Sequence, residues 1–558
     1  LRNNIFGVDI DPQAVEITMM SLYLKALEGE RGMLPKKQHL LPPLSNNIKC
    51  GNSLIGYDIL DAPLLSLRAE GEAISDETKS RINPFDWNSK SVGFGEIMES
   101  GGFDCVIGNP PYVRIQALKE WAPIEVEFYK EQYASARKGN YDIYVIFVEK
   151  GLSLLSAKGR LGFILPHKFF QSQYGVPLRE RISKGKHLSE IVHFGDQQVF
   201  EGATTYTCLL FLDKAPAKQF TFMQVKDLNS WRTAGEATKG TIVASEIKRN
   251  EWNFSIGNNA ELLNRLKKFP VKLGDVAHIF VGTQTSADDV FVLDECRFMK
   301  NHIIGFSQSL NKEVKVEMGI VHPFLRGRQI RRYDPPKTSS FLICPYEILS
   351  DSHRLLAISE MESKFPLALA YLKENKSALA MREKGKFKGV NWYSFGYPKS
   401  MTLFQKPKII VPDYNNVASF TLDSERHFYK TGYGVIVNDE SLSPRYILGL
   451  LNSPLLFKYL TSIGTSLRGG YIRFWTQFIS QLPIRTIDFN NPSEKAIHDK
   501  LVSLVDRMLE LHKKKAALPP SAEREKIERE IAVTDEKIDV IVYGLYGVTE
   551  GEKKIIEG

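Results

Sequence analysis

Cysteine is scarce in this 558-residue chain, and no two cysteines are close enough to suggest a shared role. The five are Cys50, Cys105, Cys208, Cys296 and Cys344, without a CxxC pair. Zinc sites and disulfide frameworks are built from closely spaced cysteines, so the sequence argues against both and predicts no bound metal. No run approaches the roughly 18 apolar residues that a membrane span needs, and the first ten residues, LRNNIFGVDI, do not resemble a secretory signal. These absences predict a cytoplasmic protein with no membrane partner.

Most of the chain has no excess of one charge sign, but one segment is basic. The formal net charge is +8, with 43% hydrophobic and 25% charged residues. Residues 251–485 hold 31 Lys and Arg against 21 Asp and Glu, whereas the remainder sums to −2. A basic half beside a near-neutral half is typical of a phosphate-binding module joined to a catalytic unit. An ordinary solubilising surface would have the same composition, so charge alone leaves both interpretations open.

Residues 1–215 alternate β-rich runs with helical patterns. Examples are IFGVDI (5–10) and FDCVIG (103–108), each followed by a helix-like stretch. This alternation predicts an α/β domain with a mostly parallel sheet and helices on both faces. The runs at 188–195 and 205–212 are separated by a short loop, which favours an antiparallel hairpin at the sheet edge.

The rest of the chain divides into three segments that differ in composition and hydrophobic pattern. Residues 216–250 are expected to form a connector, and residues 251–487 a mixed α+β domain with short, aromatic-rich strands. Residues 488–558 are expected to be helical. Pro519 and Pro520 must interrupt the helix there, so a helical hairpin is predicted, packed on the basic domain or on another subunit.

The strongest chemical signal is Asn109-Pro110-Pro111-Tyr112, directly after FDCVIG. A strand that ends in two prolines presents its last side chain and carbonyl at the carboxyl end of the sheet, where open α/β proteins bind ligands. An aromatic exocyclic amine is a poor nucleophile because its lone pair is delocalised. The Asn109 oxygen and the Pro110 carbonyl could accept its two N–H groups, and Tyr112 offers a ring for stacking. The alternative is a plain Pro-Pro turn.

IGNPPY after an apolar strand resembles the catalytic motif of amino-methyltransferases that use S-adenosyl-L-methionine, particularly the DNA adenine-N6 class. GVDIDPQAV (7–15) resembles that family's second motif, which implies that Asp9 binds the cofactor ribose and Ile10 packs on its adenine. GNSLIG (51–56) resembles the third motif. Asn52, with Ser53 beside it, stands where the family usually has an acid for the cofactor's adenine, and Asn109 is implied as a further cofactor contact.

Later motifs extend this resemblance. In FGDQQVFEGATTYTCLLFL (194–212), Phe200 stands where the family has an aromatic that stacks on the flipped base; Tyr206 is the second candidate, and ordinary core packing is the alternative for both. The motif order is similar to the gamma class, and most similar to type IIG restriction–modification methylases and their phage-exclusion relatives. Tail segments 406–416, 447–460, 469–484 and 534–552 resemble the specificity domain and terminal helices of those enzymes.

One family motif is absent. The glycine-rich turn DPACGSG, which wraps the methionine end of the cofactor, should precede Leu1. The resemblance therefore implies a Rossmann-like class I sheet that lacks its first strand, between the strands ending at Asp9 and Asn109. We expect the chain to be an N-terminally truncated piece of a protein with an upstream nuclease domain or a partner subunit.

The resemblance makes residues 251–487 a DNA target-recognition domain and double-stranded DNA the partner. Rotating a base out of a duplex costs a few kcal/mol, which phosphate contacts can offset. An arginine there could equally read guanine, and solvated surface charge is the alternative for each residue. The candidate DNA-binding residues are Arg326, Arg328, Arg331, Arg332, Lys384, Lys386, Lys388, Arg468 and Arg473.

The expected function is site-specific methylation of adenine N6 in DNA, as part of a restriction–modification or phage-defence system. Two alternatives stay open. Methylases of RNA or of protein glutamine share the NPPY motif, and the chain could be a non-catalytic DNA-binding fragment of a larger enzyme.

Overall fold

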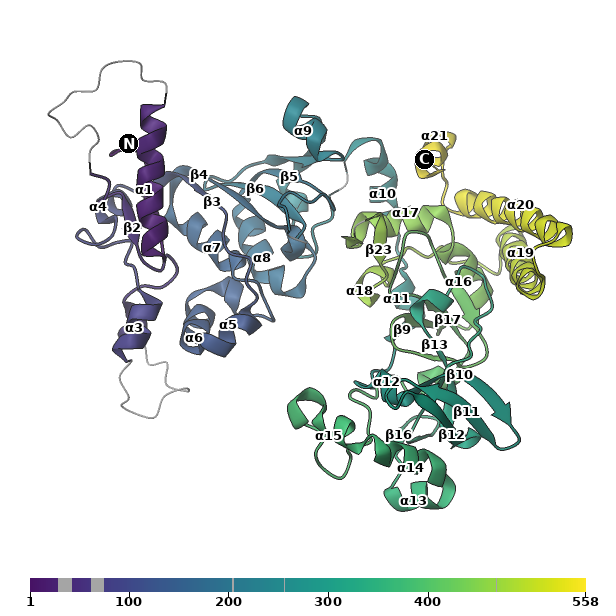
Figure 1. Cartoon of the computed structure of the whole chain (residues 1–558). Helices are drawn as coiled ribbons and strands as arrows, with labels where there is room; N and C mark the ends of the chain where they lie inside the picture. Colours follow the sequence, from purple (N-terminus) through teal and green to yellow (C-terminus); the bar gives the residue numbers. More distant parts are fainter. Residues whose placement is uncertain (29–42, 62–74, 203–204, 255, 468, 558) are drawn as a thin grey trace. The chain divides into compact units, whose positions relative to one another are not determined.

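The chain folds as two units, Leu1–Gly257 and Asn258–Gly558 (Figure 1). The computed structural model describes residues 1–28, 43–61, 75–202, 205–254, 256–467 and 469–557. Within these ranges no helix combines the length and the apolar character needed to cross a membrane.

The first unit is built on a six-stranded sheet with the order β3–β4–β6–β5–β7–β8. β3, β4, β5 and β7 point in one direction, and β6 and β8 point in the other. This agrees with the expected α/β class. The strands are β3 (Phe103–Gly108), β4 (Leu155–Pro166), β5 (Leu188–His193), β6 (Thr207–Asp213), β7 (Gln219–Gln224) and β8 (Thr238–Val243).

The expected hairpin is present, because β5 and β6 pair antiparallel, but it does not form the sheet edge. The segment 216–250, which we expected to be a connector, adds β7 and β8 beyond β5. Its helix α9 (Leu228–Ala234) packs Trp231 against the buried Phe194, with ring centroids 5.1 Å apart. The connector assignment is therefore wrong: these residues complete the first unit, because alternating apolar side chains such as Phe220 and Phe222 are buried against its core.

A second, two-stranded parallel sheet is made by β1 (Gly7–Asp9) and β2 (Ile48–Cys50). Among the described residues, no strand pairs with the edge of β3 that faces away from β4. The two sheets are joined by aromatic packing instead. Phe6 lies 5.4 Å from Phe94 and 6.0 Å from Phe103, measured between ring centroids. The described residues of the first unit therefore form two separate sheets, and the strand expected between β1 and β3 stays a prediction.

The helices of the first unit pack around these sheets. The most buried is α7, which follows the NPPY segment and places Val145, Ile146 and Val148 in the core. Burial of each such side chain contributes roughly 1.5–3 kcal/mol, which fixes α7 beneath β3 and β4. The helices are α1 (Pro12–Leu27), α2 (Asp58–Asp61), α3 (Asp76–Ile82), α4 (Gly95–Glu99), α5 (Ile115–Trp121), α6 (Pro123–Gln132), α7 (Tyr144–Leu154), α8 (Val176–Gly185) and α9.

The second unit is the expected mixture of sheets and helices. Its six-stranded sheet has the order β12–β11–β10–β14–β13–β20, and its four-stranded sheet the order β19–β17–β21–β9. Smaller sheets are formed by β18–β23–β22 and β15–β16. The strands are β9 (Ala277–Val281), β10 (Val292–Met299), β11 (His302–Ser307), β12 (Lys312–Glu317), β13 (Val321–Leu325), β14 (Phe341–Ile343), β15 (Tyr346–Ile348), β16 (His353–Leu355), β17 (Lys408–Val411), β18 (Tyr414–Asn415), β19 (Thr421–Asp423), β20 (Phe428–Tyr429), β21 (Tyr433–Val437), β22 (Ser466–Leu467) and β23 (Tyr471–Arg473).

The helices of the second unit end in the predicted hairpin. α19 and α20 are separated at Pro519 and Pro520 and pack along each other. Leu501 of α19 and Ile538 of α20 share a core cluster with α16 and β17, so the hairpin packs on the basic domain, one of the two expected outcomes. The helices are α10 (Ala260–Lys267), α11 (Leu273–Val276), α12 (Asp288–Phe291), α13 (Ile358–Lys364), α14 (Pro366–Glu374), α15 (Lys376–Gly385), α16 (Pro444–Leu451), α17 (Pro454–Ile463), α18 (Thr476–Ile479), α19 (Pro492–Ala517), α20 (Ala522–Leu545) and α21 (Glu550–Glu557).

Candidate active site

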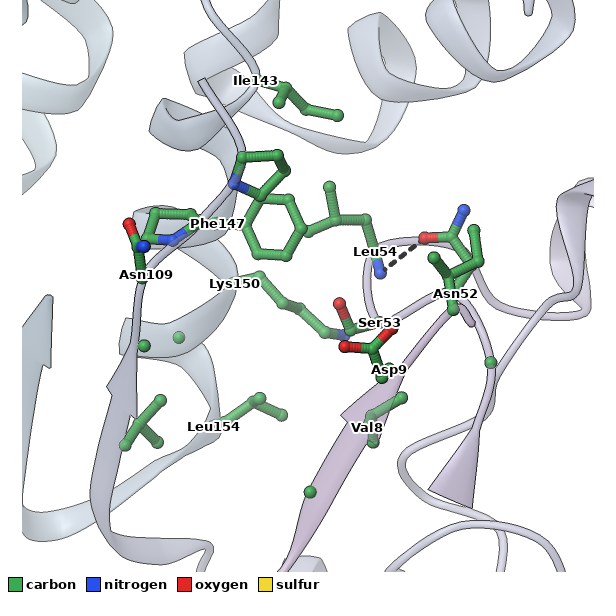
Figure 2. A pocket seen from close by; sticks show the side chains of 18 of the residues that line it. Val8, Asp9, Asn52, Ser53, Leu54, Asn109, Ile143, Phe147, Lys150 and Leu154 are labelled. Atoms are coloured by element: carbon green, nitrogen blue, oxygen red, sulfur yellow. Dashed lines mark hydrogen bonds between the residues drawn. The ribbon is translucent and has the colours of Figure 1, made fainter. Parts of the chain in front are cut away.

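A cavity of about 750 Å³ lies between β1 and β3 in the first unit (Figure 2). The ends of both strands open into it, together with the loop after β2 and one face of α7. Most residues predicted from the sequence for cofactor binding and catalysis line this one cavity: Asp9, Ile10, Asn52, Ser53, Asn109, Pro110 and Pro111.

The Asp9 carboxylate lies at the end of β1, just before α1. Its Oδ1 accepts the backbone N–H of Asp11 at 2.9 Å, and Asp11 in turn caps α1 by accepting the N–H of Gln13 at 2.8 Å. No donor among the described residues reaches the second oxygen of Asp9. Beside it, the Ile10 side chain is 51% exposed. The strand end therefore presents a carboxylate oxygen and an apolar side chain to a ligand.

The loop after β2 is held from several sides. The Asn52 side-chain oxygen accepts the N–H of Leu54 at 3.0 Å. The Trp87 indole N–H donates to the carbonyl of Ser53 at 2.9 Å, and the Tyr133 hydroxyl donates to the carbonyl of Leu54 at 2.6 Å. These bonds fix the Asn52 and Ser53 side chains on the cavity wall. The Asn52 oxygen keeps one lone pair for a further donor.

The NPPY segment forms the opposite wall. Asn109 is exposed and Pro110 is buried. The Tyr112 hydroxyl lies 2.8 Å from the Asn109 side-chain oxygen and 3.2 Å from the carbonyl of Ile164. Burial, with a smaller contribution from Cys208, raises the pKa of Tyr112 to about 12, so this hydroxyl is a proton donor at neutral pH. No donor in the described part of the chain bonds the carbonyl of Pro110.

The aromatic residues predicted to stack on a base do not line the cavity. Tyr112 is half-buried with its ring edge-on to Tyr144, at a centroid distance of 6.4 Å. Phe200 is half-exposed in the loop between β5 and β6. The second candidate, Tyr206, stacks on His167 with centroids 6.4 Å apart and an interplanar angle of 18°. Their stacking roles stay predictions.

Two cavity residues on α7 were missed by the sequence reasoning. Phe147 and Lys150 line the cavity with Gly151 and Leu154 (Figure 2). Their spacing of i, i+3, i+4 and i+7 is that of one helix face, and it was the available signal. Burial lowers the pKa of Lys150. Within the described ranges no group of three or more His, Cys, Asp or Glu is arranged to hold a metal.

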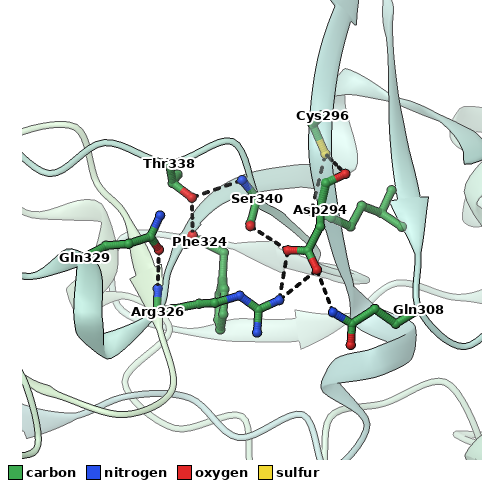
Figure 3. Close-up of polar contacts among 9 residues, drawn as sticks. Asp294, Cys296, Gln308, Phe324, Arg326, Gln329, Thr338 and Ser340 are labelled. Atoms are coloured by element: carbon green, nitrogen blue, oxygen red, sulfur yellow. Dashed lines mark hydrogen bonds and ion pairs between the residues drawn. The ribbon is translucent and has the colours of Figure 1, made fainter. Parts of the chain in front are cut away.

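Several predicted DNA-binding residues are instead used inside the second unit. Arg326 Nη2 bonds both oxygens of Asp294, at 2.8 and 2.9 Å, and Ser340 and Gln308 bond the same carboxylate (Figure 3). Arg332 Nη2 bonds Asp535 Oδ1 at 2.7 Å and the carbonyl of Asn452 at 3.0 Å. For Arg326 and Arg332 these bonds support a structural role.

The other basic candidates fall into three groups. Arg473 is paired with Asp413, and Lys386 with Glu383. Arg468 lies outside the described residues. The remaining four are exposed, and their side chains form no ion pair or hydrogen bond with the described residues: Arg328, Arg331, Lys384 and Lys388.

Comparisons with known proteins find one family match in each of the two units. Residues 3–200 match the family of the Eco57I restriction-modification methylase, and residues 322–484 match the TaqI-like C-terminal specificity domain. The type II restriction enzyme and methyltransferase RM.Eco57I of Escherichia coli is 29% identical over 99% of this chain and 54% of its own length. The type II methyltransferase M.PaeR7I of Pseudomonas aeruginosa is 25% identical over 72% of this chain and 68% of its own length.

A solved structure shares the fold. The type IIL restriction-modification enzyme MmeI, solved in complex with DNA, aligns with a TM-score of 0.57 at 14% identity, covering 100% of this chain and 72% of MmeI. This chain spans about half the length of its Escherichia coli relative RM.Eco57I. By sequence, this chain is similar to the Eco57I restriction-modification methylases over residues 3–200 and to the TaqI-like C-terminal specificity domains over residues 322–484.

Proposed function

We propose that this chain carries the catalytic and specificity parts of a restriction–modification DNA methyltransferase that modifies adenine N6. The observation that carries the proposal is the shared cavity: Asn109 and Pro110 line it together with Asp9 and Asn52. The relatives supply the substrate class, because their names describe type II methyltransferases. The specificity-domain match and the basic charge of residues 251–485 support duplex DNA as the partner.

The strand tip suits an amine nucleophile. The Asn109 oxygen has one lone pair left after accepting from Tyr112, and the Pro110 carbonyl has both. Two acceptors that bind the two N–H groups of adenine N6 weaken the conjugation of nitrogen with the ring. The nitrogen lone pair can then attack the methyl carbon of a sulfonium donor, so that the N–C bond would form as the C–S bond breaks and a neutral thioether would leave. The extra proton on nitrogen would then pass by way of these acceptors to solvent.

The cavity residues also suit the nucleoside part of S-adenosylmethionine, which would supply the electrophilic methyl group when bound. Asp9 has a carboxylate oxygen free for the ribose hydroxyls, and Asn52 offers an amide to the adenine. Ile10, Phe147 and Leu54 provide apolar walls. Lys150 adds a cation on the same wall.

The test is transfer of labelled methyl groups from S-adenosylmethionine to duplex DNA, structured RNA and protein, with the complete gene product. Nucleoside analysis should find label only in N6-methyladenine of DNA. Label confined to RNA, to protein or to cytosine would contradict the proposal. Asn109→Ala should lower kcat by about 100-fold or more, the range seen when one transition-state hydrogen bond is removed, while DNA affinity changes by less than a few-fold. Loss of DNA binding instead would make Asn109 a structural residue.

A further inference from the structure

The last residues of α15, from Arg382 to Gly385, do not have helical backbone angles. Arg382 has extended backbone angles (φ −54°, ψ 146°). Glu383, Lys384 and Gly385 then take positive φ values of 48°, 62° and 86°. Two successive non-glycine residues in the left-handed region are unusual and persist only where the surroundings impose them. The chain therefore turns sharply into a loop, residues 383–391.

Arg382 anchors the start of this loop. Its buried guanidinium donates to four backbone carbonyls, and its charge lies 4.3 Å from the Phe387 ring centroid. The Arg382 side chain thus connects the loop to α15, to the segment after β9 and to residues 392–394. The four bonds run from Nε to Leu379 (2.8 Å), from Nη1 to Thr285 (2.7 Å), and from Nη2 to Trp392 (2.9 Å) and Ser394 (2.8 Å).

Glu383 makes a second set of tethers. Its carboxylate accepts from Ser286 Oγ at 3.2 Å, from Lys386 Nζ at 3.3 Å and from the Tyr397 hydroxyl at 3.4 Å. Lys386 therefore already has an anionic partner within the loop. The backbone of residues 383–386 is held from both sides before any partner arrives.

The same loop leaves two cations unused. Lys384 and Lys388 are exposed, and neither ammonium has an ion pair or a hydrogen bond to the described residues. At the tip, Val390 is 82% exposed. Because Arg382 and Glu383 already hold the loop, anion binding by these two lysines would not require the loop backbone to be ordered first. The loop lies within residues 322–484, the part that matches a specificity domain.

We propose that residues 383–391 form a pre-ordered loop that binds the sugar–phosphate backbone of duplex DNA through Lys384 and Lys388. This rests on the proposed function, which supplies DNA as the partner. Charge complementarity argues for phosphate, because the free side chains are ammonium groups and the loop's own carboxylate, Glu383, already accepts from Lys386, Ser286 and Tyr397. Lys386 makes little contribution for the same reason.

The test measures the dissociation constant for duplex DNA against salt concentration, with the complete gene product. Each lost phosphate contact should reduce the slope of log affinity against log salt by about 0.9. K384A/K388A should therefore reduce the slope by about 1.8 and weaken binding roughly tenfold or more at 0.15 M salt. K386A should reduce it by well under 0.9.

The matched control is K300A/K315A, which removes the same charge from two other exposed lysines of the second unit, in the β10–β11 turn and on β12. It should leave affinity within twofold. All four side chains are exposed, so both variants should unfold at the wild-type temperature. Equal salt slopes for K384A/K388A and the control variant would overturn the loop proposal. The proposed function would still stand in that case if the wild-type protein methylated DNA. A wild-type protein without DNA affinity would overturn both.

Discussion

The Tyr112 hydroxyl lies 2.8 Å from the side-chain oxygen of Asn109, so one of the two acceptors at the strand tip is itself held by a hydrogen bond. This bond fixes the amide with its oxygen toward Tyr112 and limits rotation about its last torsion. The role expected from the sequence, a ring that stacks on a base, would not require the hydroxyl.

Tyr112→Phe separates these two roles because it keeps the ring and removes the hydroxyl. We expect kcat for methylation to fall about 3–10-fold, the effect of one neutral hydrogen bond, with KM for DNA unchanged. Steady-state methylation kinetics give both parameters. Tyr112→Ala should raise KM as well if the ring stacks on the base, whereas identical kinetics for wild type and Tyr112→Phe would show that the hydroxyl has no role.

A buried ion pair stabilises the second unit. Lys408 Nζ and Asp423 Oδ2 are 2.7 Å apart, and both side chains are fully buried. Asp423→Asn should lower the free energy of unfolding by about 3–5 kcal/mol, because it leaves the Lys408 ammonium buried without a counter-charge. Urea unfolding measures this. The double variant Lys408→Met, Asp423→Asn should recover part of the loss, because it removes the unpaired ammonium and keeps an acceptor for the backbone N–H groups of Glu425 and His427. An Asp423→Asn protein as stable as wild type would contradict a charged pair.

Asp539 should make the second unit less stable as the pH rises. Burial, reinforced by the nearby Asp535 carboxylate, raises the pKa of Asp539 to about 7, and its Oδ1 has no hydrogen-bond partner among the described residues. A raised pKa in an acid means that the folded state holds the proton more tightly than the unfolded state. The contribution is thus fully present below about pH 4 and lost as the pH rises toward 7.

Asp539→Asn tests this by removing the titration. We expect the variant to be more stable than wild type by roughly 1–3 kcal/mol at pH 8, less than the whole shift would give because the residue is partly solvated, and nearly equal to it at pH 4. Thermal or urea unfolding across this range measures the difference. A constant difference at both pH values would contradict the titration.

Arg332 should affect stability and not DNA binding. Its Nη2 joins Asp535 of α20 to the carbonyl of Asn452, between α16 and α17, so Arg332→Met leaves two acceptors unpaired. We expect a loss of about 1.5–3 kcal/mol in unfolding free energy, as for hydrogen bonds to charged groups. DNA affinity and its salt dependence should be those of wild type. A reduced salt slope would return Arg332 to the DNA-contact residues.

Local patterns in the sequence selected several residues that line one cavity. Asp9, Asn52 and Asn109 each follow a strand end, and parallel strands place such ends at one edge of a sheet, so short segments carried enough information. The Pro519-Pro520 break likewise predicted the terminal hairpin. Phe147 and Lys150 were missed although their helical spacing was visible, because an apolar helix face usually indicates core packing.

The basic residues could not be sorted in the same way. Arg326 and Arg332 find their carboxylates at Asp294 and Asp535, far away in sequence. An exposed arginine and a paired arginine cannot be distinguished in the sequence, because only the tertiary fold brings the partner carboxylate near. Residues 216–250 were misassigned for a related reason, since β7 pairs with β5 and its short run QFTFMQ is a weak strand signal without that neighbour.

The two sheets of the first unit share ring contacts but, within the described ranges, no backbone ladder, and the cavity lies along the seam between them. Ring packing has no register, so it sets the spacing of the two edges less firmly than a ladder would. A ligand that binds both Asp9 and Asn109 would therefore hold the two sheets at a fixed distance from each other. A free ligand concentration of 100 times the dissociation constant would raise the free energy of unfolding of this unit by about 2.7 kcal/mol. Ligand binding in the cavity and alignment of the reacting groups would then be one event.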